Sequence, residues 1–256
     1  MLNITVTGLA TTMIAPYLPV FLYENLGISI GSVSFLYFAS GMLGTLSVFL
    51  IGWLVDGVGR RAVYMFGNMS AILVPAAFTR IATFEQVLSV FSASGLMDSA
   101  SRTSQTTIIA DQVEEGKRNT AYGISRILGN AAWIVAPILG GLLLSGGYQQ
   151  LFLVSAIIGL IAVVLFVVLV PESRKAGLEK PSLPKLRVLK NRDLLVLCVA
   201  SLFSMLFYSQ FYSLLPIFAN EVKGLSQLEI GLLFSISGAT VVALQFPTSR
   251  WLEKYS

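Results

Sequence analysis

The sequence predicts an all-α polytopic membrane protein, and two observations carry this prediction. The 256 residues are 55% hydrophobic and only 12% charged, whereas an ordinary soluble domain is about 25% charged. The apolar residues also gather into eight runs, each long enough to cross a bilayer core of ~30 Å as a helix. The runs lack the two-residue alternation of barrel strands, so we expect helices, which satisfy their own backbone hydrogen bonds in lipid.

The eight predicted spans follow one another along the chain, and each is nearly free of charged residues. They cover residues 3–23, 30–54, 63–82, 86–110, 120–145, 148–171, 193–219 and 228–250. One long connection, which contains two prolines, follows the sixth span. We therefore divide the chain into an N-terminal six-helix transmembrane bundle (1–171), a basic cytoplasmic central loop (172–192) and the first two helices of an incomplete C-terminal bundle (193–256).

The distribution of Lys and Arg predicts the orientation in the membrane. With a cytoplasmic N-terminus, thirteen of the 17 Lys and Arg residues fall on the cytoplasmic side, and only Arg80 and Lys223 fall outside. The remaining two, Arg102 and Arg126, lie within spans. Positive charge collects on the cytoplasmic side of membrane proteins. We therefore expect a multi-pass protein of the plasma (inner) membrane with both termini in the cytoplasm.

The composition argues against several classes of function. Histidine, the commonest metal ligand and acid–base catalyst, is absent, and one cysteine cannot build a cysteine-rich metal site. The sequence shows no nucleophile–base set, phosphate-binding loop or metal cluster, so we expect no enzyme, no bound metal and no cofactor. The net charge of +4 follows from membrane topology, and we expect no nucleic acid partner.

The last two spans repeat the first two. When the sequence is shifted by 197 residues, LPVFLYENLGISIGSVSFLYFASG falls on LPIFANEVKGLSQLEIGLLFSISG without a gap. Proline, glutamate, glycine and serine match in one register, and Glu24 falls on Glu221. Internal repeats of this kind are typical of transporters. Because the first unit has six spans, we expect the second to need six as well, and the chain to be truncated after its eighth span.

The repeat, the basic central loop and the loop after the second span together resemble the major facilitator superfamily (MFS). The family's signature after helix two is Gly-x-x-x-Asp-Arg-x-Gly-Arg-Arg/Lys, and this chain has Gly52, Asp56, Gly59, Arg60 and Arg61, with Gly57 in place of the first arginine. The resemblance implies an MFS-type helical bundle and a conformational-switch loop that stabilises the outward-open state. It also implies that the aspartate faces a helix N-terminus of the other half, where the helix dipole favours a carboxylate.

The fifth span resembles a second signature of the family, the antiporter motif Gly-x8-Gly-x3-Gly-Pro-x2-Gly-Gly. Its positions hold Gly123, Ala132, Ala136, Pro137, Gly140 and Gly141. The small residues at 132, 136 and 140 form a stripe that would let another helix approach closely. The eighth span carries a similar stripe of Gly231, Ser235, Ala239 and Ala243, and we expect the two stripes to face each other. The motif implies a drug:proton antiporter-like transporter; the alternative is a kinked packing helix without that role.

Three charged residues lie inside predicted spans, where a charge costs on the order of 3 kcal/mol and usually faces a cavity. Asp98 and Arg102 are one turn apart on the fourth span, and Arg126 lies at a comparable depth on the fifth, with Asn130 one turn further along. One interpretation is a proton and substrate cluster, in which Asp98 exchanges a proton and the arginines bind anionic groups. The other is a self-neutralising Asp98–Arg102 pair that only locks the fourth helix.

Polar residues of other spans complete the candidate sites. Tyr208, Gln210, Tyr212 and Gln245 on the seventh and eighth spans either line a substrate site or bond between helices. Asp111, near the end of the fourth span, is expected to be a solvated helix-end charge. The first span contains no acid, which weakens the case for a cationic drug as substrate.

These features favour secondary active transport of a small molecule by alternating access. The first hypothesis is proton-coupled export, or antiport, with protons as the coupling ion and the lipid bilayer as the surrounding partner. The alternatives are proton-coupled uptake of an organic anion or sugar, and a truncated, transport-incompetent membrane protein of the same family. The sequence identifies neither the substrate nor the direction.

Overall fold

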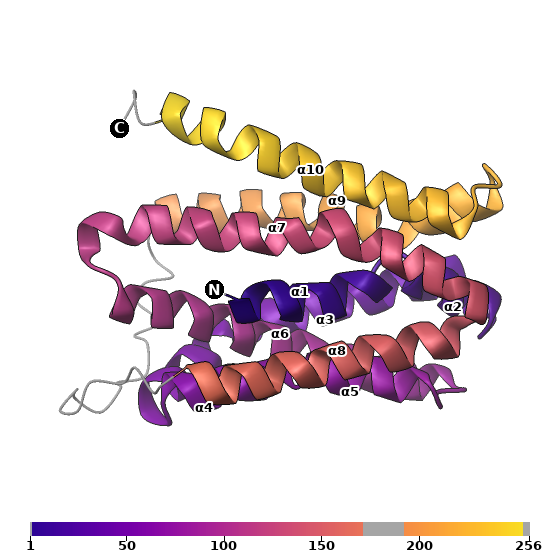
Figure 1. The fold of residues 1–256 in the computed structure, drawn as a ribbon, viewed down its shortest axis with the longest axis horizontal. Helices are drawn as coiled ribbons and strands as arrows, with labels where there is room; N and C mark the ends of the chain where they lie inside the picture. The colour runs from indigo at the N-terminus through magenta and orange to yellow at the C-terminus, as the bar shows by residue number, and fades with distance from the viewer. Residues whose placement is uncertain (1, 171–191, 253–256) are drawn as a thin grey trace.

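The computed structural model describes residues 2–170 and 192–252, and within these ranges it is built of helices without a strand (Figure 1). The α-helices are α1 (Leu2–Ile14), α2 (Leu18–Glu24), α3 (Ile30–Gly57), α4 (Arg60–Asn68), α5 (Ser70–Phe78), α6 (Phe84–Gln112), α7 (Arg118–Leu143), α8 (Tyr148–Leu169), α9 (Arg192–Glu221) and α10 (Gln227–Leu252). Short 3₁₀ turns at Glu115–Lys117 and Leu144–Gly146 flank α7. The predicted all-α bundle is confirmed, whereas all but the last residue of the predicted central loop lies outside the described residues.

All eight predicted spans are helical, but two of them are each built from two helices. Residues 15–17 separate α1 from α2, because Pro16 and Pro19 cannot donate backbone hydrogen bonds. A turn at Met69 separates α4 from α5. Five segments of the described chain are long and apolar enough to cross a membrane: Leu2–Glu24, Ile30–Gly57, Glu115–Gly146, Tyr148–Leu169 and Gln227–Gln245.

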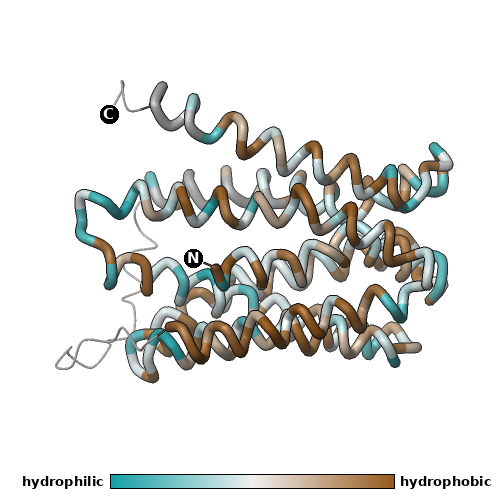
Figure 2. The backbone as a smooth tube through the Cα atoms, viewed as in Figure 1, coloured by the Kyte–Doolittle hydropathy of each residue, from teal (hydrophilic) through white to brown (hydrophobic). Residues whose placement is uncertain are grey.

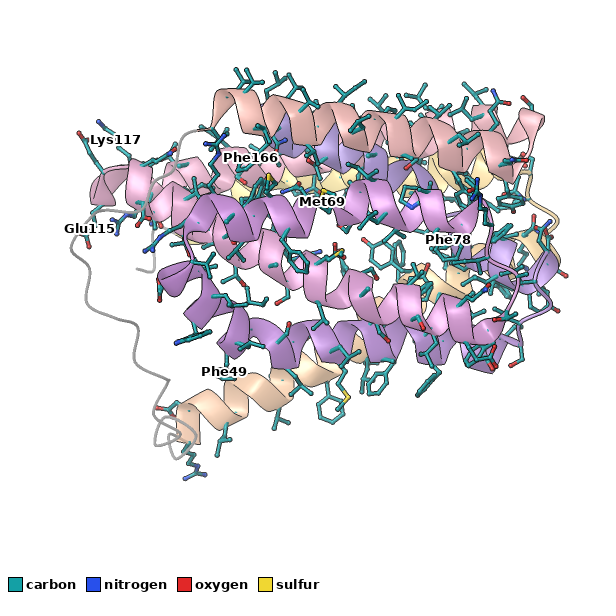
Figure 3. All side chains as sticks on the ribbon, turned by 90° about the horizontal axis from the view of Figure 1, so that it is seen from below. Phe49, Met69, Phe78, Glu115, Lys117 and Phe166 are labelled. Carbon is teal, nitrogen blue, oxygen red and sulfur yellow. The ribbon has the colours of Figure 1, made fainter. Side chains whose placement is uncertain are left out.

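The helices run roughly along the long axis of the molecule, so that hydrophilic residues collect at its two ends and hydrophobic ones between them (Figures 1 and 2). Large apolar side chains remain at the surface of this middle zone: Phe49 is 60% and Ile157 57% exposed. Such surfaces fit contact with lipid and not with water. The first turn of α1 and the last turn of α10 point toward the same end of the bundle, where Glu115 and Lys117 lie (Figures 1 and 3). We call this the basic end, because Arg60, Arg61, Lys117 and Arg118 lie there.

Aromatic rings fill the interior between α2, α5, α6 and α8. Phe78 lies between helices (Figure 3), and its ring centroid is 6.2 Å from that of Phe21, 6.3 Å from that of Phe91 and 5.6 Å from that of Phe152. Phe21 and Phe152 also meet edge to face at 5.1 Å. Edge-to-face contacts of this kind add to the packing energy of large rings. They hold the bundle together toward the end opposite the basic end.

Glycines set the distances between neighbouring helices. A Cβ added to Gly44 on α3 would lie 2.9 Å from the carbonyl oxygen of Gly95 on α6. A Cβ at Gly67 on α4 or at Gly159 on α8 would likewise collide with the backbone of a facing helix. Because lipid supplies no hydrophobic force between helices, close backbone packing of this kind stabilises membrane bundles.

The internal repeat is visible in the backbone. Gly27 after α2 has φ of 65°, and its counterpart Gly224 after α9 has φ of 63°. The preceding turns also correspond, because Leu26 N bonds to Phe21 O and Lys223 N bonds to Phe218 O. Glycine adopts a positive φ without a steric penalty. The shared turn confirms that α9 and α10 repeat the helices of the first two spans.

Candidate functional site

The loop between α3 and α4 is shaped by one glycine. Gly59, the residue before α4, has φ of 123°, a conformation that side chains rarely adopt. Arg60 begins α4 directly after this turn, and its side chain points back toward the C-terminal end of α3. Gly52, by contrast, has no neighbouring atom within 4 Å of where a Cβ would lie, so close packing in the described structure does not require a glycine there.

Arg60 joins three helices. Its side chain is only 6% exposed; Nε donates to Asp111 Oδ2 at 3.0 Å, and Nη2 lies 3.4 Å from Asp56 Oδ1. Nη1 donates to the Val55 carbonyl oxygen at 3.3 Å. The expectation that Asp111 is merely a solvated helix-end charge is therefore wrong, because a nearly buried guanidinium recruits both acids. Asp56 contacts Arg60 within the same bundle, and its meeting with a helix N-terminus of the other half stays a prediction.

Arg61 extends the loop's contacts to the outer side of the bundle. Its Nη2 donates to the carbonyl oxygen of Val167 at 2.5 Å, near the C-terminal end of α8. Cations are favoured at helix C-termini, where backbone carbonyls lack intrahelical partners. The two arginines of the loop thus fasten α3, α4, α6 and α8 together at the basic end.

The small-residue stripe of α7 faces α1, and the prediction that it faces the eighth span is wrong. A Cβ at Gly8 on α1 would lie 2.8 Å from the Ala132 Cβ, and Thr12 Oγ1 donates to the Ala132 carbonyl oxygen at 3.4 Å. Ala132 and Ala136 are completely buried, and Gly140 lies against the backbone of α1 at Met13. By size alone the stripe could pack against α1 or α10. In the structure it packs against α1, where Gly8 faces Ala132.

A different face of α7 meets α10. A Cβ at Gly231 would lie 2.6 Å from the Pro137 carbonyl oxygen, and one at Gly238 would lie 2.9 Å from the Trp133 Cβ. The predicted meeting of the fifth and eighth spans is thus confirmed, but in another register. Ser235 is buried like Gly231, whereas Ala239 and Ala243 are exposed.

Tyr17 connects these two packing faces and was not predicted. It is completely buried in the break between α1 and α2, and its hydroxyl donates to the Pro137 carbonyl oxygen at 2.5 Å. The same hydroxyl would lie 2.4 Å from a Cβ at Gly231, so α1, α7 and α10 meet at this point. A tyrosine next to a proline inside an apolar run was the available sequence signal.

A second set of polar residues missed by the sequence analysis links α1, α4 and α8. Asn3 Nδ2 donates to the Ala162 carbonyl oxygen at 2.6 Å, and Tyr64 Oη donates to Asn3 Oδ1 at 2.8 Å. Thr7 Oγ1 donates to Asn68 Oδ1 at 3.0 Å. Asparagines within apolar spans were the signal, since polar groups in a membrane bond across helices.

The charged residues inside the spans are not joined into an ion-paired cluster. Asp98 lies deep among the helices but is solvent-accessible, and its Oδ1 accepts a 3.4 Å hydrogen bond from Ser70 Oγ on α5. The self-neutralising pair is not found, because the described ion pairs do not include one between Asp98 and Arg102. Asn130 donates to the Arg126 carbonyl oxygen at 2.8 Å and so bonds within its own helix.

The predicted polar residues of α9 belong to an aromatic cluster. Tyr212 Oη donates to Tyr208 Oη at 3.5 Å, and the Tyr212 ring lies 5.4 Å from the Trp133 ring and 6.0 Å from the Phe234 ring. Gln210 is exposed. Gln245, further along α10, is half-buried and also has an interaction partner.

Comparison with known proteins agrees with this architecture. The family model described as Major Facilitator Superfamily matches residues 1–256. The chain is 25% identical to the uncharacterized MFS-type transporter YqjV of Bacillus subtilis (strain 168), over 97% of this chain and 62% of that protein. It is 24% identical to the probable galactarate/D-glucarate transporter GarP of Escherichia coli (strain K12), over 83% of this chain and 56% of that protein. The chain thus spans about six-tenths of the length of these relatives.

A solved structure shares the fold. The bacterial homolog of the human lysosomal transporter Spinster, in an inward-facing and occupied conformation, superposes with a TM-score of 0.72 at 16% identity, over 96% of this chain and 57% of that one. At this identity the likeness concerns the fold alone. Together with the family model over the whole chain, the internal repeat and the Arg60 loop, it leads to one conclusion: this chain is a membrane-spanning member of the Major Facilitator Superfamily of transporters.

Proposed function

We propose that the chain belongs to a secondary active transporter that exports a small molecule in exchange for protons, by alternating access. The observation that carries the proposal is that contacts between the two repeat units concentrate at the end opposite the basic end. On α9, Ser213, Ile217 and Ala219 are buried, whereas Val196 is 62% and Phe207 78% exposed. One closed end and one open end are what a rocking transporter has in each of its two main states.

The faces of α7 and α10 support the same asymmetry. Their contact is tightest between Gly231 and Gly238 on α10 and the residues from Trp133 to Pro137 on α7. Nearer the basic end, Arg126 is exposed, and no atom lies within 4 Å of where a Cβ at Gly123 would be. Because the positive-inside rule places the basic end in the cytoplasm, we assign this conformation as inward-open, in a plasma membrane protein whose termini are both cytoplasmic.

Asp98 is the group we propose for proton coupling. It lies mid-span with an exposed side chain, and its described partners are the Ser70 hydroxyl and the electrostatic field of Arg102, without an ion pair. A charged acid at this depth is costly and therefore suited to exchange a proton between the two states. The antiporter-like motif of α7 supports exchange in opposite directions, although its glycines at 132 and 136 have become alanines.

The experiment is proton flux in proteoliposomes that contain the full chain, under an imposed pH gradient. We expect the wild type to move protons and Asp98→Asn to lose most of that flux. Glu115→Gln, which changes an exposed acid in the α6–α7 turn, is the matched control and should behave like the wild type. Equal flux in wild type and Asp98→Asn removes Asp98 from the mechanism, and no flux in the wild type supports the transport-incompetent alternative.

A second candidate is proton-coupled uptake of an organic anion or sugar. Two arginines inside the spans favour it, because a proton on Asp98 reduces the opposing negative charge and so strengthens anion binding. The relative GarP is named as a probable transporter of galactarate and D-glucarate, which are sugar acids. The direction of proton movement separates the candidates. Export by antiport predicts that the compartment that the substrate leaves becomes more acidic, and uptake predicts that substrate and protons enter together.

A further inference from the structure

We infer that Arg102 and Arg126 bind the negatively charged group of the transported molecule, so that the substrate is an amphiphilic organic anion with a carboxylate or a similar oxyanion. This inference rests on the proposed transport function and names the substrate class of its site. It holds for either direction of transport, because both directions require the site to be loaded.

Neither arginine side chain is held by a hydrogen bond or an ion pair with a residue in the described ranges 2–170 and 192–252, although Arg102 feels the charge of Asp98 on the same helix. Both are exposed, in contrast to Arg60, which binds two acids. A guanidinium inside a membrane span is costly unless water or a counter-charge compensates it. A ligand that carries the counter-charge therefore gains binding energy at both positions.

The two arginines lie at nearly the same depth in the bundle. Gln105 Nε2 on α6 donates to Ser125 Oγ on α7 at 2.7 Å, and Tyr122 Oη donates to the Thr106 carbonyl oxygen at 3.2 Å. These bonds fix the register of two antiparallel helices. Arg102 is three residues from one bonded residue, and Arg126 is next to the other. Because 1.5 Å separates successive residues along a helix, their Cα atoms differ by only a few ångströms in depth.

Both arginines lie on helix faces turned toward an aromatic cluster, defined as Trp133, Tyr208, Phe211, Tyr212 and Phe234. Arg126, Asn130 and Trp133 are spaced by four and three residues and so share the face of α7 that meets α10. Arg102 on α6 interacts electrostatically with Tyr212 on α9. Arg126 therefore lies about two turns from Trp133 on one face of α7, and Arg102 on α6 is near enough to Tyr212 for its charge to act on it.

The aromatic cluster supplies the apolar half of the site. The Trp133 ring stacks on Phe234 at 6.1 Å with an interplanar angle of 25°, and Phe211 lies 5.2 Å from Phe234. Tyr208 is 65% exposed and stands at the edge of the cluster. Ring faces and edges of this kind bind apolar bodies, and the tyrosine hydroxyls offer donors for an anion. Together with the arginines they fit a molecule with an anionic head and an apolar or aromatic body.

Charge selectivity is tested with three probes of one shape: 2-naphthoate, neutral 2-naphthamide and cationic 2-naphthylmethylammonium. Each is titrated by calorimetry into the purified full chain in lipid nanodiscs. We expect 2-naphthoate to bind about tenfold or more tightly than 2-naphthamide, because charge-assisted hydrogen bonds are the stronger ones. The cation should bind weakest. Equal affinity for the three probes, tighter binding of the cation, or no measurable binding of the carboxylate overturns the inference.

Variants then test the residues. Arg102→Gln and Arg126→Gln should each weaken 2-naphthoate binding about tenfold and leave 2-naphthamide binding unchanged. Lysine at either position should retain part of the affinity, since it keeps the charge but not the bidentate geometry. Arg80→Gln, an exposed arginine at the opposite end, is the matched control and should bind as the wild type does. Unchanged 2-naphthoate affinity in both folded Gln variants contradicts the assignment.

Failure of this inference differs from failure of the proposed function. A chain that moves protons in liposomes but prefers the cation keeps the transport proposal and loses the anion site. A chain that binds 2-naphthoate through both arginines but moves no protons keeps the anion site and loses proton-coupled transport.

Discussion

The side-chain amide of Asn220 on α9 donates a hydrogen bond to the carboxylate of Glu24 on α2, and this bond joins the two repeat units at the end opposite the basic end. Asn220 Nδ2 also donates to Glu221 Oε1 at 3.3 Å. Glu24 and Glu221 occupy equivalent positions of the repeat. Acids from corresponding positions therefore meet through one amide. Under the proposed alternating access, this contact has to break when that end of the bundle opens.

Asn220→Ala should loosen the closed end. Without the amide, Glu24 and Glu221 face each other without a donor between them, and like charges repel. A cysteine introduced at Asn25, next to Glu24, reports on this end in a Cys198→Ala background. We expect it to react several-fold faster with a membrane-impermeant maleimide when Asn220 is alanine than when Asn220 is present. Gln210→Ala changes an exposed residue of the same helix and is the control. An unchanged reaction rate means that the Glu24–Asn220 bond does not hold this end closed.

Arg60→Ala should destabilise the basic end. The substitution removes the guanidinium that contacts Asp111 and Asp56. Because these acids are 24% and 56% exposed, we expect a loss of about 1–2 kcal/mol, less than for a fully buried pair. The measurement is the thermal unfolding midpoint of the purified chain. Lys117→Ala removes an ion pair whose partners are 74% and 77% exposed and should leave the midpoint unchanged. Equal midpoints for both variants contradict the structural role of Arg60.

Leucine substitutions should separate the two faces of α10. Gly238→Leu places a side chain against Trp133, where even a Cβ is too close, and we expect it to separate α7 from α10 and abolish transport. Ala239→Leu adds the same bulk to an exposed neighbour and should retain transport. The readout is proton flux in proteoliposomes, with membrane insertion checked for each variant. Transport by Gly238→Leu, or its loss in Ala239→Leu, would contradict the observed register.

Tyr17→Phe tests the point where α1, α7 and α10 meet. The substitution keeps the ring and removes only the hydroxyl that donates to the Pro137 carbonyl oxygen. We expect a loss of about 1 kcal/mol in stability, the usual net value of one hydrogen bond. Tyr23→Phe, which alters a half-buried tyrosine in the same span, serves as comparison. Identical unfolding midpoints for Tyr17→Phe and the wild type would show that the Tyr17 hydroxyl does not stabilise the fold.

The sequence was sufficient for features that depend on local composition. Apolar runs located all the helical spans, and the 197-residue repeat anticipated the matching turns at Gly27 and Gly224. Contacts between distant segments were harder. The stripe at Ala132 and Ala136 fits any small-residue neighbour, and only the packed bundle selects α1.

Competition among polar partners was the other limit. The i, i+4 spacing of Asp98 and Arg102 allowed an ion pair, but the Ser70 hydroxyl of another helix bonds to Asp98 instead. Asp111 was expected to be solvated, because its partner Arg60 is 51 residues away in the chain. The partner of a polar side chain depends on which side chains tertiary packing brings together, and a single sequence does not reveal those long-range contacts.

Alternating access is the central claim, and paired distances measured by spin labels test it most directly. One pair, Ile124 with Leu244, reports on exposed positions of α7 and α10 toward the basic end; the other, Gln149 with Val222, reports on the opposite end. When the pH or the concentration of 2-naphthoate is changed, we predict that the Ile124–Leu244 distance shortens as the Gln149–Val222 distance lengthens. A single unchanged distribution at both pairs under all conditions would contradict the claim.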